Sequence, residues 1–433
     1  MRIAIVGAGI AGLGSARLLQ QQGHATTVFE AQRRPGGHTH TVDVALDGLT
    51  HPVDTGFLVF NDRTYPRLCA LFDDLGIKSV ASEMSFSVRH DGAGLEWAGT
   101  SAAALFAQPR NALRPRFWSM LADILRFNRE TTAGLASGTL PDVPLGEFLD
   151  TRGFGTPLRD WYLLPMAAAI WSSPQREILA FPLRTFVRFC HNHGLLAIRN
   201  RPQWRTVAGG GRTYVERIVH ALPDVRTGCP VLRVQRRPGG VLVDSDARVG
   251  ERFDAIVLAC HSDQALALLH DASAEERRLL GAVRYQRNRV LLHTDAALLP
   301  RNRRAWSAWN YLAADGDDGE RPVAVSYLIN KLQPLPFRSP VIVTLNPPVE
   351  PDPALVLSEF DYEHPLLDGR AIAAQDAFAS LQGARGTWFA GAWLGYGFHE
   401  DGLASAHAVA DAIASQDAIA TQGADAGTRR IAA

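Results

Sequence analysis

The stretch RIAIVGAGIAGLGSARLL, residues 2–19, decides the fold that we expect for this chain of 433 residues. Its apolar run Ile3–Val6 predicts a buried parallel strand. Three glycines follow in the pattern G-x-G-x-x-G, at Gly7, Gly9 and Gly12. Between a strand and a helix, such glycines permit a tight turn, a close approach of the backbone to a pyrophosphate, and close helix–strand packing.

The residues after this turn complete a nucleotide-binding unit. A helix is expected over 11–22 and a second strand over Ala25–Phe29, which ends in Glu30. An acid at this point accepts hydrogen bonds from an adenosine ribose, and the N-terminus of the helix attracts the phosphates. The pattern predicts a dinucleotide-binding domain, with cofactor contacts from Gly7, Gly9, Ile10, Ala11, Gly12, Glu30 and Ala31.

The composition is that of an ordinary globular protein, and it excludes several classes. Hydrophobic residues make up 46%, and 44 Lys and Arg balance 44 Asp and Glu, so no overall charge attracts nucleic acid. The four cysteines have no CxxC spacing, which fits a reducing cytoplasm and predicts neither disulfides nor a cysteine metal site. No run of about 18 apolar residues occurs, so no membrane span is expected.

Two further glycine-rich segments extend the argument. EAQRRPGGHTHTV, residues 30–42, contains an Arg-x-Gly-Gly pattern whose arginine offers charge to a pyrophosphate. GTWFAGAWLGYGFHEDGLASAHAVADAIA, residues 386–414, predicts a strand over 388–390, a glycine loop and a helix over 403–414. The N-terminal dipole of that helix would stabilise negative charge on a ligand.

Together with DTGFLVFN (54–61), HNHGLL (191–196) and NKLQ (330–333), these segments resemble the flavin-containing amine oxidase superfamily. The nearest resemblance is to bacterial flavoproteins associated with cyclopropane fatty-acid synthases. It implies FAD as the cofactor. It also implies an α/β fold, in which a Rossmann-like FAD-binding domain is interleaved with an α+β substrate domain.

The resemblance divides the chain between these two domains. The FAD-binding domain is expected at 1–75, 204–269 and 361–415, and the substrate domain at 76–203 and 270–360. The Ala- and Gly-rich composition of 416–433 predicts a disordered tail. The resemblance also implies further cofactor contacts, from Arg34, Gly36, Gly37, His38, Thr39, Asp54, Thr55, Gly56, Val231, Gly391, Asp401, Gly402 and Leu403.

Three residues of the C-terminal motif are candidates for chemistry on the substrate. His399 and Glu400 lie in the loop expected at the flavin, where they either orient substrate and shuttle a proton or only order the loop. Tyr396 resembles in position the aromatic residues that wall the flavin in amine oxidases. Those enzymes hold a lysine at flavin N5, which the only lysines of this chain, Lys78 and Lys331, do not clearly match.

Two apolar segments of the expected substrate domain leave alternatives open. Residues 105–129 contain five arginines and a set of apolar residues at helical spacing: Phe117, Met120, Leu121, Ile124, Leu125 and Phe127. Such a segment either packs on a neighbour or dips into a membrane surface to take up a lipid. Residues 160–174 either form a core helix or line a tunnel to the flavin. His191 and His193 lack a third ligand, so no metal is expected.

From these features we expect an FAD-dependent oxidoreductase, cytoplasmic or peripheral on the inner face of the membrane. The preferred reaction is hydride transfer from a hydrophobic substrate, a fatty-acyl or other lipid chain, to flavin N5, followed by reoxidation by oxygen or another acceptor. A flavin amine oxidase is one alternative. A flavin-binding accessory protein that assists a lipid methyltransferase, its partner, is another.

Overall fold

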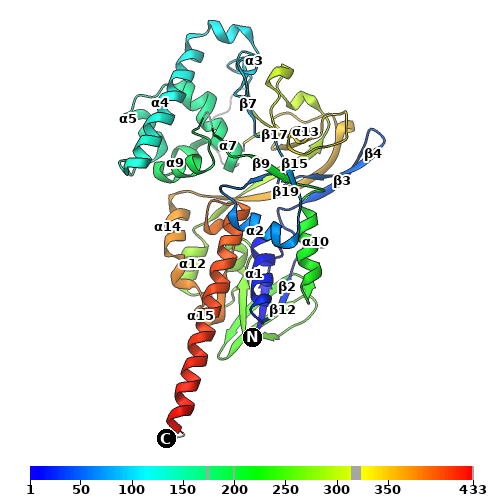
Figure 1. Cartoon of the computed structure of the whole chain (residues 1–433), viewed down its shortest axis with the longest axis vertical. Coiled ribbons are helices and arrows are strands. Elements are labelled where there is room, and N and C mark those ends of the chain that lie inside the picture. The colour runs from blue at the N-terminus through cyan, green and yellow to red at the C-terminus, as the bar shows by residue number, and fades with distance from the viewer. Residues whose placement is uncertain (172–174, 198–199, 314–322, 432–433) are drawn as a thin grey trace.

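The structure is a computed structural model that describes residues 1–171, 175–197, 200–313 and 323–431; for residues 419–431 only the helical course is described. Two lobes lie one above the other (Figure 1). A parallel sheet of five strands, in the order β10-β2-β1-β14-β20, forms the centre of the lower lobe. The strands are β1 (Arg2–Val6), β2 (Ala25–Phe29), β10 (Val225–Arg226), β14 (Ala255–Leu258) and β20 (Thr387–Phe389).

The central strand β1 buries side chains on both of its faces. Ile3 and Ile5 belong to the large core that the helices on one side share, whereas Ala4 and Val6 join a second core on the other side. Both faces are therefore covered, as the continuous apolar run predicted. The helices on the first side are α1 (Ile10–Gln21), α2 (Pro66–Leu75), α10 (Arg212–Ala221) and α15 (His399–Ile431).

The second side is covered by an antiparallel sheet and three helices. The sheet consists of β11 (Val231–Arg237), β12 (Gly240–Ser245) and β13 (Glu251–Phe253). The hairpin between β11 and β12 turns at Pro238 and Gly239, two residues that favour turns. The helices are α11 (Ser262–Leu268), α12 (Ala274–Leu280) and α14 (Gly369–Ala377).

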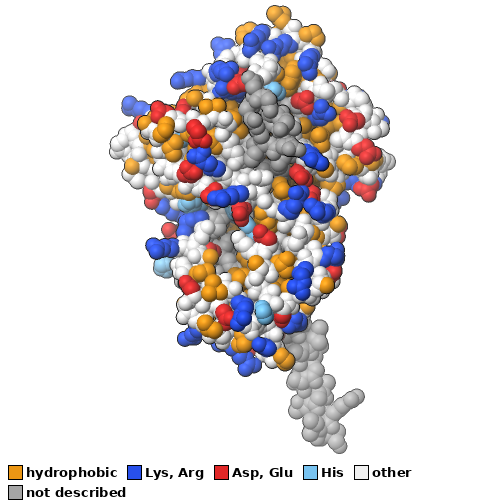
Figure 2. Space-filling model, turned by 180° about the vertical axis from the view of Figure 1, so that it is seen from behind, with side chains coloured by type: hydrophobic (Ala, Val, Ile, Leu, Met, Phe, Trp, Pro, Cys, Tyr) orange, Lys and Arg blue, Asp and Glu red, His pale blue; other side chains and the backbone are white. Residues whose placement is uncertain are grey.

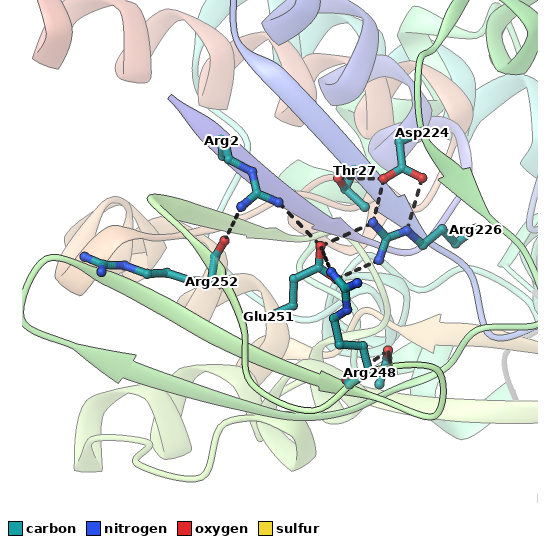
Figure 3. Close-up of polar contacts among 8 residues, drawn as sticks. Arg2, Thr27, Asp224, Arg226, Arg248, Glu251 and Arg252 are labelled. Atoms are coloured by element: carbon teal, nitrogen blue, oxygen red, sulfur yellow. Dashed lines mark hydrogen bonds and ion pairs between the residues drawn. The ribbon is translucent and has the colours of Figure 1, made fainter.

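A network of charged side chains ties strands β1, β2 and β10 of the parallel sheet to β13 of the antiparallel sheet (Figure 3). The carboxylate of Glu251 accepts from Arg226 at 2.7 Å and from Arg2 at 3.4 Å. Arg226 also donates to Asp224, which in turn accepts from the Thr27 hydroxyl at 3.0 Å. The hydrogen bond from Arg226 holds the pKa of Glu251 below its ordinary value, so the network stays charged near neutral pH.

The upper lobe is built on a sheet of seven strands in the order β19-β15-β18-β17-β16-β7-β8. Neighbouring strands are antiparallel except for the parallel pair β16 and β7. The strands are β7 (Phe86–His90), β8 (Leu95–Ala98), β15 (Arg284–His293), β16 (Trp309–Ala313), β17 (Val325–Leu328), β18 (Ile342–Leu345) and β19 (Val356–Leu366).

Helices cover one end of the upper lobe, and small sheets join it to the lower lobe (Figure 1). The helices include α3 (Ala102–Leu105), α4 (Pro115–Ser137), α5 (Leu145–Thr151), α7 (Leu164–Trp171), α8 (Gln175–Leu179) and α9 (Leu183–Asn192). The short helix α13 (Ile329–Leu332) lies apart from them, directly after β17. The joining strands are the pair β3 (Thr41–Leu46) and β4 (Leu49–Asp54), and the sheet of β5 (Phe60–Asn61), β9 (Trp204–Val207) and β6 (Ser79–Ala81). Within the described ranges, no helix combines the length and the hydropathy that a membrane crossing requires.

The structure corrects the expected end of the chain. The helix predicted over 403–414 begins at His399 and continues to Ile431, where a disordered tail was expected from residue 416. Alanine favours helix more than any other residue, and no proline interrupts 416–431. Figure 1 shows this end of α15 projecting from the lower lobe.

The segment 105–129 is not a single helix. A 3-10 turn at Pro109–Leu113, termed η1, separates α3 from α4, because prolines at 109 and 115 favour new helix starts. Phe117, Met120 and Phe127 are buried against the lobe, so most of the predicted apolar face packs inward, although Leu125 is exposed. The side chains of α7 in the second apolar segment are nearly all buried, and residues 172–174 of that segment lie outside the described residues.

Candidate functional site

The glycine turn between β1 and α1 leaves open room beside its backbone. Gly7 has a positive φ of 102°, and a Cβ on Gly12 would collide with the Gly7 carbonyl oxygen, so both positions require glycine. A Cβ on Gly9, in contrast, would meet no atom within 4 Å. The space beside Gly9 is therefore available to a ligand at the N-terminus of α1, where Ile10 and Ala11 lie in the first turn.

Glu30 lies over this turn from the end of β2. One carboxylate oxygen accepts from the Ala8 N–H at 2.8 Å and the other from the Gln32 N–H at 2.8 Å. The Glu30 carbonyl accepts from the N–H of Cys229, two residues before the buried Val231 at the start of β11. The turn, the acid and β11 thus meet where the sequence placed an adenosine. Ala31, the next residue, is exposed.

The second glycine loop lies directly against the first. The Gly36 N–H donates to the Ala8 carbonyl at 2.8 Å. The Arg34 guanidinium donates to the carbonyls of Gly37 and Thr39, at 2.9 and 2.8 Å. The arginine that was expected to contact a pyrophosphate therefore holds its own loop in shape, and its contact with a cofactor stays a prediction.

His38 presents a buried polar atom without a protein partner. Its ring lies 5.2 Å from that of His364 and 5.5 Å from that of Tyr362, between centroids. Its Nε2 has no hydrogen-bond partner among the described residues. Burial, and then the neighbouring His364, lower the pKa of His38 well below its ordinary value. Because an unpaired buried polar atom costs about 1–3 kcal/mol, this nitrogen fits a polar group of a ligand.

The segment 54–56 runs beside the second glycine loop. The Thr55 N–H donates to the His40 carbonyl at 2.9 Å, and a Cβ on Gly56 would collide with the His38 carbonyl oxygen. Asp54 is buried and accepts from the Gly211 N–H at 2.9 Å, at the start of α10. Burial raises the pKa of Asp54 to about 6. The structure thus shows Asp54 at a helix start, and its contact with a flavin stays a prediction.

His399, the first residue of α15, links the C-terminal motif to the second glycine loop. Its Nε2 lies 2.9 Å from Thr39 Oγ1 and 3.1 Å from the Tyr214 hydroxyl. Its ring stacks on Phe57 with 3.8 Å between centroids. Burial lowers the pKa of His399 to about 3, so the imidazole is neutral near pH 7. The neutral His399 ring therefore holds the start of α15 against Thr39, Tyr214 and Phe57. A role for His399 in proton shuttling stays a prediction.

The two carboxylates after His399 bond to backbone. Glu400 accepts from the N–H groups of Arg67 and Leu68, each at 3.0 Å, and thereby caps the N-terminus of α2. Asp401 accepts from the Phe398 N–H at 2.9 Å, and burial raises its pKa to about 6. Glu400 therefore has a structural role that is visible here, whereas its catalytic role stays a prediction.

Helices α15 and α1 approach closely at their first turns. A Cβ on Gly402 would lie 2.9 Å from Ile10 Cγ2, and a Cβ on Gly14 would lie 2.9 Å from Leu403 Cδ2. Before α15, the Gly391 N–H donates to Ser405 Oγ at 2.9 Å. Two helix N-termini thus converge on the glycine turn, and their dipoles favour negative charge there.

Aromatic side chains close the side of the site that faces the upper lobe. We call Phe189, His193, Tyr396 and Phe398 the junction cluster. Phe189 of α9 lies 5.2 Å from Phe398, 5.5 Å from Tyr396 and 4.0 Å from His193, between ring centroids. The His193 Nδ1 lies 3.0 Å from the Phe189 carbonyl, which can only accept, so the hydrogen is on Nδ1 and Nε2 is an acceptor.

Several of these residues were not predicted from the sequence. Tyr214, Gln333, Tyr362 and Ser405 contact predicted site residues, and His193 completes the junction cluster. His193 and Gln333 lie in the quoted segments HNHGLL and NKLQ, and Ser405 lies in the C-terminal segment 386–414, whereas Tyr214 and Tyr362 lie outside the segments singled out from the sequence. Among the residues placed by the structure, no group of three or more His, Cys, Asp and Glu is arranged to hold a metal.

Comparison with known proteins identifies the class. The family model for flavin containing amine oxidoreductases matches residues 10–287. A carotenoid phi-ring synthase of Streptomyces griseus is 30% identical over 296 residues, 63% of this chain and 54% of that protein. The chain thus spans about half the length of this relative.

Two solved structures are similar in fold. A CLA-producing fatty acid isomerase from P. acnes has a TM-score of 0.67 at 18% identity, covering 96% of this chain and 98% of that one. A putrescine oxidase has a TM-score of 0.69 at 16% identity, covering 96% and 99%. At these identities the likeness shows the fold, which is that of two-domain flavoproteins.

The chain therefore belongs to the family of flavin-containing amine oxidoreductases, and FAD is its cofactor. The residues present fit this group. Open room beside Gly9, two converging helix N-termini and the unpaired Nε2 of His38 suit the anionic part of the cofactor. Glu30 suits the ribose.

Proposed function

We propose that this chain removes a hydride from a C–H bond of a hydrophobic substrate, a fatty-acyl or other lipid chain, in a reaction of the desaturase or dehydrogenase type. Bound FAD supplies the hydride acceptor, flavin N5. The observation that carries the proposal is the junction cluster, because its surface is aromatic and it lies where the C-terminal motif meets the upper lobe.

The junction cluster offers an apolar wall with a single titratable imidazole. Phe189 and Phe398 exclude water and contact hydrocarbon without any charge. Burial lowers the pKa of His193, which keeps it neutral, and its Nε2 can accept a hydrogen bond or a proton from a substrate. A neutral acceptor in an aromatic wall suits an acyl chain with a weakly polar group.

The two lysines give no support to an amine-oxidising site. The Lys331 ammonium is held by Glu83 at 2.9 Å on the surface. Lys78 is exposed, immediately before β6 of the small joining sheet. The family's flavin-side lysine therefore has no evident counterpart, which favours carbon–carbon over carbon–nitrogen oxidation.

The names of similar proteins support an apolar substrate, and one of them also supports an amine substrate. A carotenoid ring synthase and a fatty acid isomerase are named for apolar molecules, whereas a putrescine oxidase of the same fold is named for an amine. A flavin amine oxidase is therefore the second candidate.

The test is incubation of the FAD-loaded protein with phospholipids that contain methylated acyl chains, followed by mass spectrometry of the lipids. We expect an acyl species that has lost two hydrogens, formed by the wild type and not by a variant unable to bind FAD. If no acyl species changes while a panel of amines releases peroxide, the amine oxidase candidate replaces the proposal. If neither occurs, the remaining hypothesis is that the chain is an accessory protein. That hypothesis is tested by measuring the activity of a lipid methyltransferase with and without the chain.

A further inference from the structure

The end of the upper lobe farthest from α15 combines apolar and cationic side chains. We define the tip as residues 97–125, which hold α3, η1 and the first half of α4, and residues 300–306, which hold the 3-10 turn η4 at Arg303–Ala305. Figure 1 shows α3 and the start of α4 at this end. Ala98, Ala104, Ala107 and Ala305 pack together and hold the two segments in place.

Large apolar side chains project from the tip into solvent. Leu113 is 85% exposed, Trp118 51% and Leu125 56%, which makes three of the ten exposed large hydrophobics among the described residues. Trp118 and Leu125 are seven residues apart and lie on one face of α4. The Trp118 indole N–H donates to the Ala112 carbonyl at 2.9 Å, so the ring can enter an apolar phase with its donor already paired.

The tip is cationic. Residues 97–125 contain Arg110, Arg114 and Arg116 and a single acid, Asp123, and residues 300–306 contain Arg301, Arg303 and Arg304 and no acid. The Asp123 carboxylate pairs with Arg126 and accepts from the Gly155 N–H at 3.0 Å, and Arg301 pairs with Asp91 at 3.1 Å. At the upper end of Figure 2, arginine and apolar side chains are interspersed.

Glu96, which immediately precedes the tip, is turned inward. Glu96 is 2% exposed, and its oxygens accept from the N–H groups of Arg301 and Asn302 at 2.9 and 3.0 Å. Arg110 and Arg114 donate to the carbonyls of Gly94 and Ala93 rather than to carboxylates. The guanidinium charges of these two residues are therefore available to an anionic surface.

We propose that the tip docks on the surface of an anionic phospholipid bilayer. Leu113, Trp118 and Leu125 would enter the boundary of the acyl chains, and the arginines would contact the phosphates, as in amphipathic surface helices. Charge complementarity selects this occupant, because an apolar stripe flanked by six arginines and only one acid, which is itself paired with Arg126, suits lipid phosphates better than neutral lipid. The proposal does not depend on the reaction catalysed.

The test is cosedimentation of the FAD-loaded protein with vesicles of phosphatidylglycerol and phosphatidylcholine, and with vesicles of phosphatidylcholine alone. We expect binding to the anionic vesicles that weakens as salt is added. The double variant Leu113→Ser/Trp118→Ser and the double variant Arg303→Gln/Arg304→Gln should each weaken binding about tenfold or more, a change of ~1.4 kcal/mol.

Matched controls keep the result interpretable. Leu232 is exposed on β11 in the lower lobe, and Leu232→Ser should bind vesicles as the wild type does. FAD content and melting temperature check that each variant is folded. The proposal is overturned if the wild type does not sediment with anionic vesicles, which would leave a protein partner as the occupant of the tip. It is also overturned if the tip variants sediment as well as Leu232→Ser.

Discussion

Asp54 and Gln333 are joined by two hydrogen bonds that run in opposite directions. The Gln333 amide donates to Asp54 Oδ2 at 2.7 Å, and the Asp54 N–H donates to Gln333 Oε1 at 3.0 Å. Both residues are buried. The pair connects the end of β4 with the NKLQ segment, 279 residues away, and so fixes the site segment 54–56 against the upper lobe.

Replacing Gln333 with methionine removes both bonds at nearly constant volume. The buried Asp54 N–H then lacks an acceptor, and Asp54 Oδ2 keeps only its 3.1 Å bond from the Gly211 N–H, so we expect the free energy of unfolding to fall by about 1–3 kcal/mol. Urea denaturation measures the change. Lys331→Met, which breaks only the surface pair with Glu83, is the control and should cost less than about 1 kcal/mol. Equal losses in the two variants would contradict the prediction.

Gly9→Val should separate cofactor binding from folding. A Cβ at Gly9 meets no protein atom within 4 Å, so the apo protein should melt within a few degrees of the wild type. The valine fills the room where the backbone approaches the pyrophosphate, so bound flavin absorbance should disappear. Gly369→Val, also in open space but on α14, is the matched control and should stay yellow. A yellow Gly9→Val protein would refute the assignment of this space to FAD.

Glu400 should act as a helix cap. We expect Glu400→Ala to lower the free energy of unfolding by about 1–2 kcal/mol, because the first N–H groups of α2 lose their acceptor, and Glu400→Gln to cost less because one oxygen remains. Chemical denaturation provides the values. Glu216→Ala, on the exposed face of α10, should cost less than about 0.5 kcal/mol. Equal stability of all three variants would exclude the capping role.

Acid should destabilise the protein through its buried histidines. His293 accepts from the Asp295 N–H at 3.1 Å and pairs with Thr344, and burial lowers its pKa to about 4. In the unfolded chain the His293 imidazole takes up a proton near pH 6.5, whereas in the folded chain it does so only near pH 4. The contribution of His293 to the free energy of unfolding is therefore complete above pH 6.5 and is lost as the pH falls to about 4. The slope is about 1.4 kcal/mol per pH unit for each such histidine.

Asp54 stabilises the folded protein on acidification, and so offsets part of the loss caused by the histidines. Its folded pKa of about 6 exceeds the unfolded value, so protonation below pH 6 favours the folded state. Because His40, His364 and His399 also have lowered pKa values, we expect a net loss of stability on acidification. Denaturation curves between pH 4 and 8 should show a shallower loss for His293→Gln, and no change for His191→Gln, which is exposed. An unchanged slope in His293→Gln would disprove the assignment.

The elements that depend on local pattern were predictable from the sequence. The strand 3–6, the glycine turn and Glu30 lie within one short stretch, and their contacts follow from neighbouring residues. The hairpin at Pro238–Gly240 follows from its turn residues in the same way. Such features need no knowledge of the rest of the chain.

The contacts that complete the site join distant segments and gave no local signal. Tyr214 lies on an ordinary amphipathic helix and meets His399, 185 residues later. Glu400 resembles a site carboxylate in its motif, yet it caps a helix 333 residues earlier, which no spacing rule reveals. Side-chain direction in the assembled fold decides these roles.

The close packing of α15 on α1 has a consequence for how the protein is made. The glycine turn leaves the ribosome early, but Gly402 and Leu403, which cover α1, are synthesised nearly 400 residues later. At about 5–20 residues per second this delay is on the order of 20–80 s. Until then the apolar side of α1 has no permanent neighbour from α15, and the converging helix ends do not exist. The complete flavin site, with both helix ends in place, can therefore form only late in synthesis.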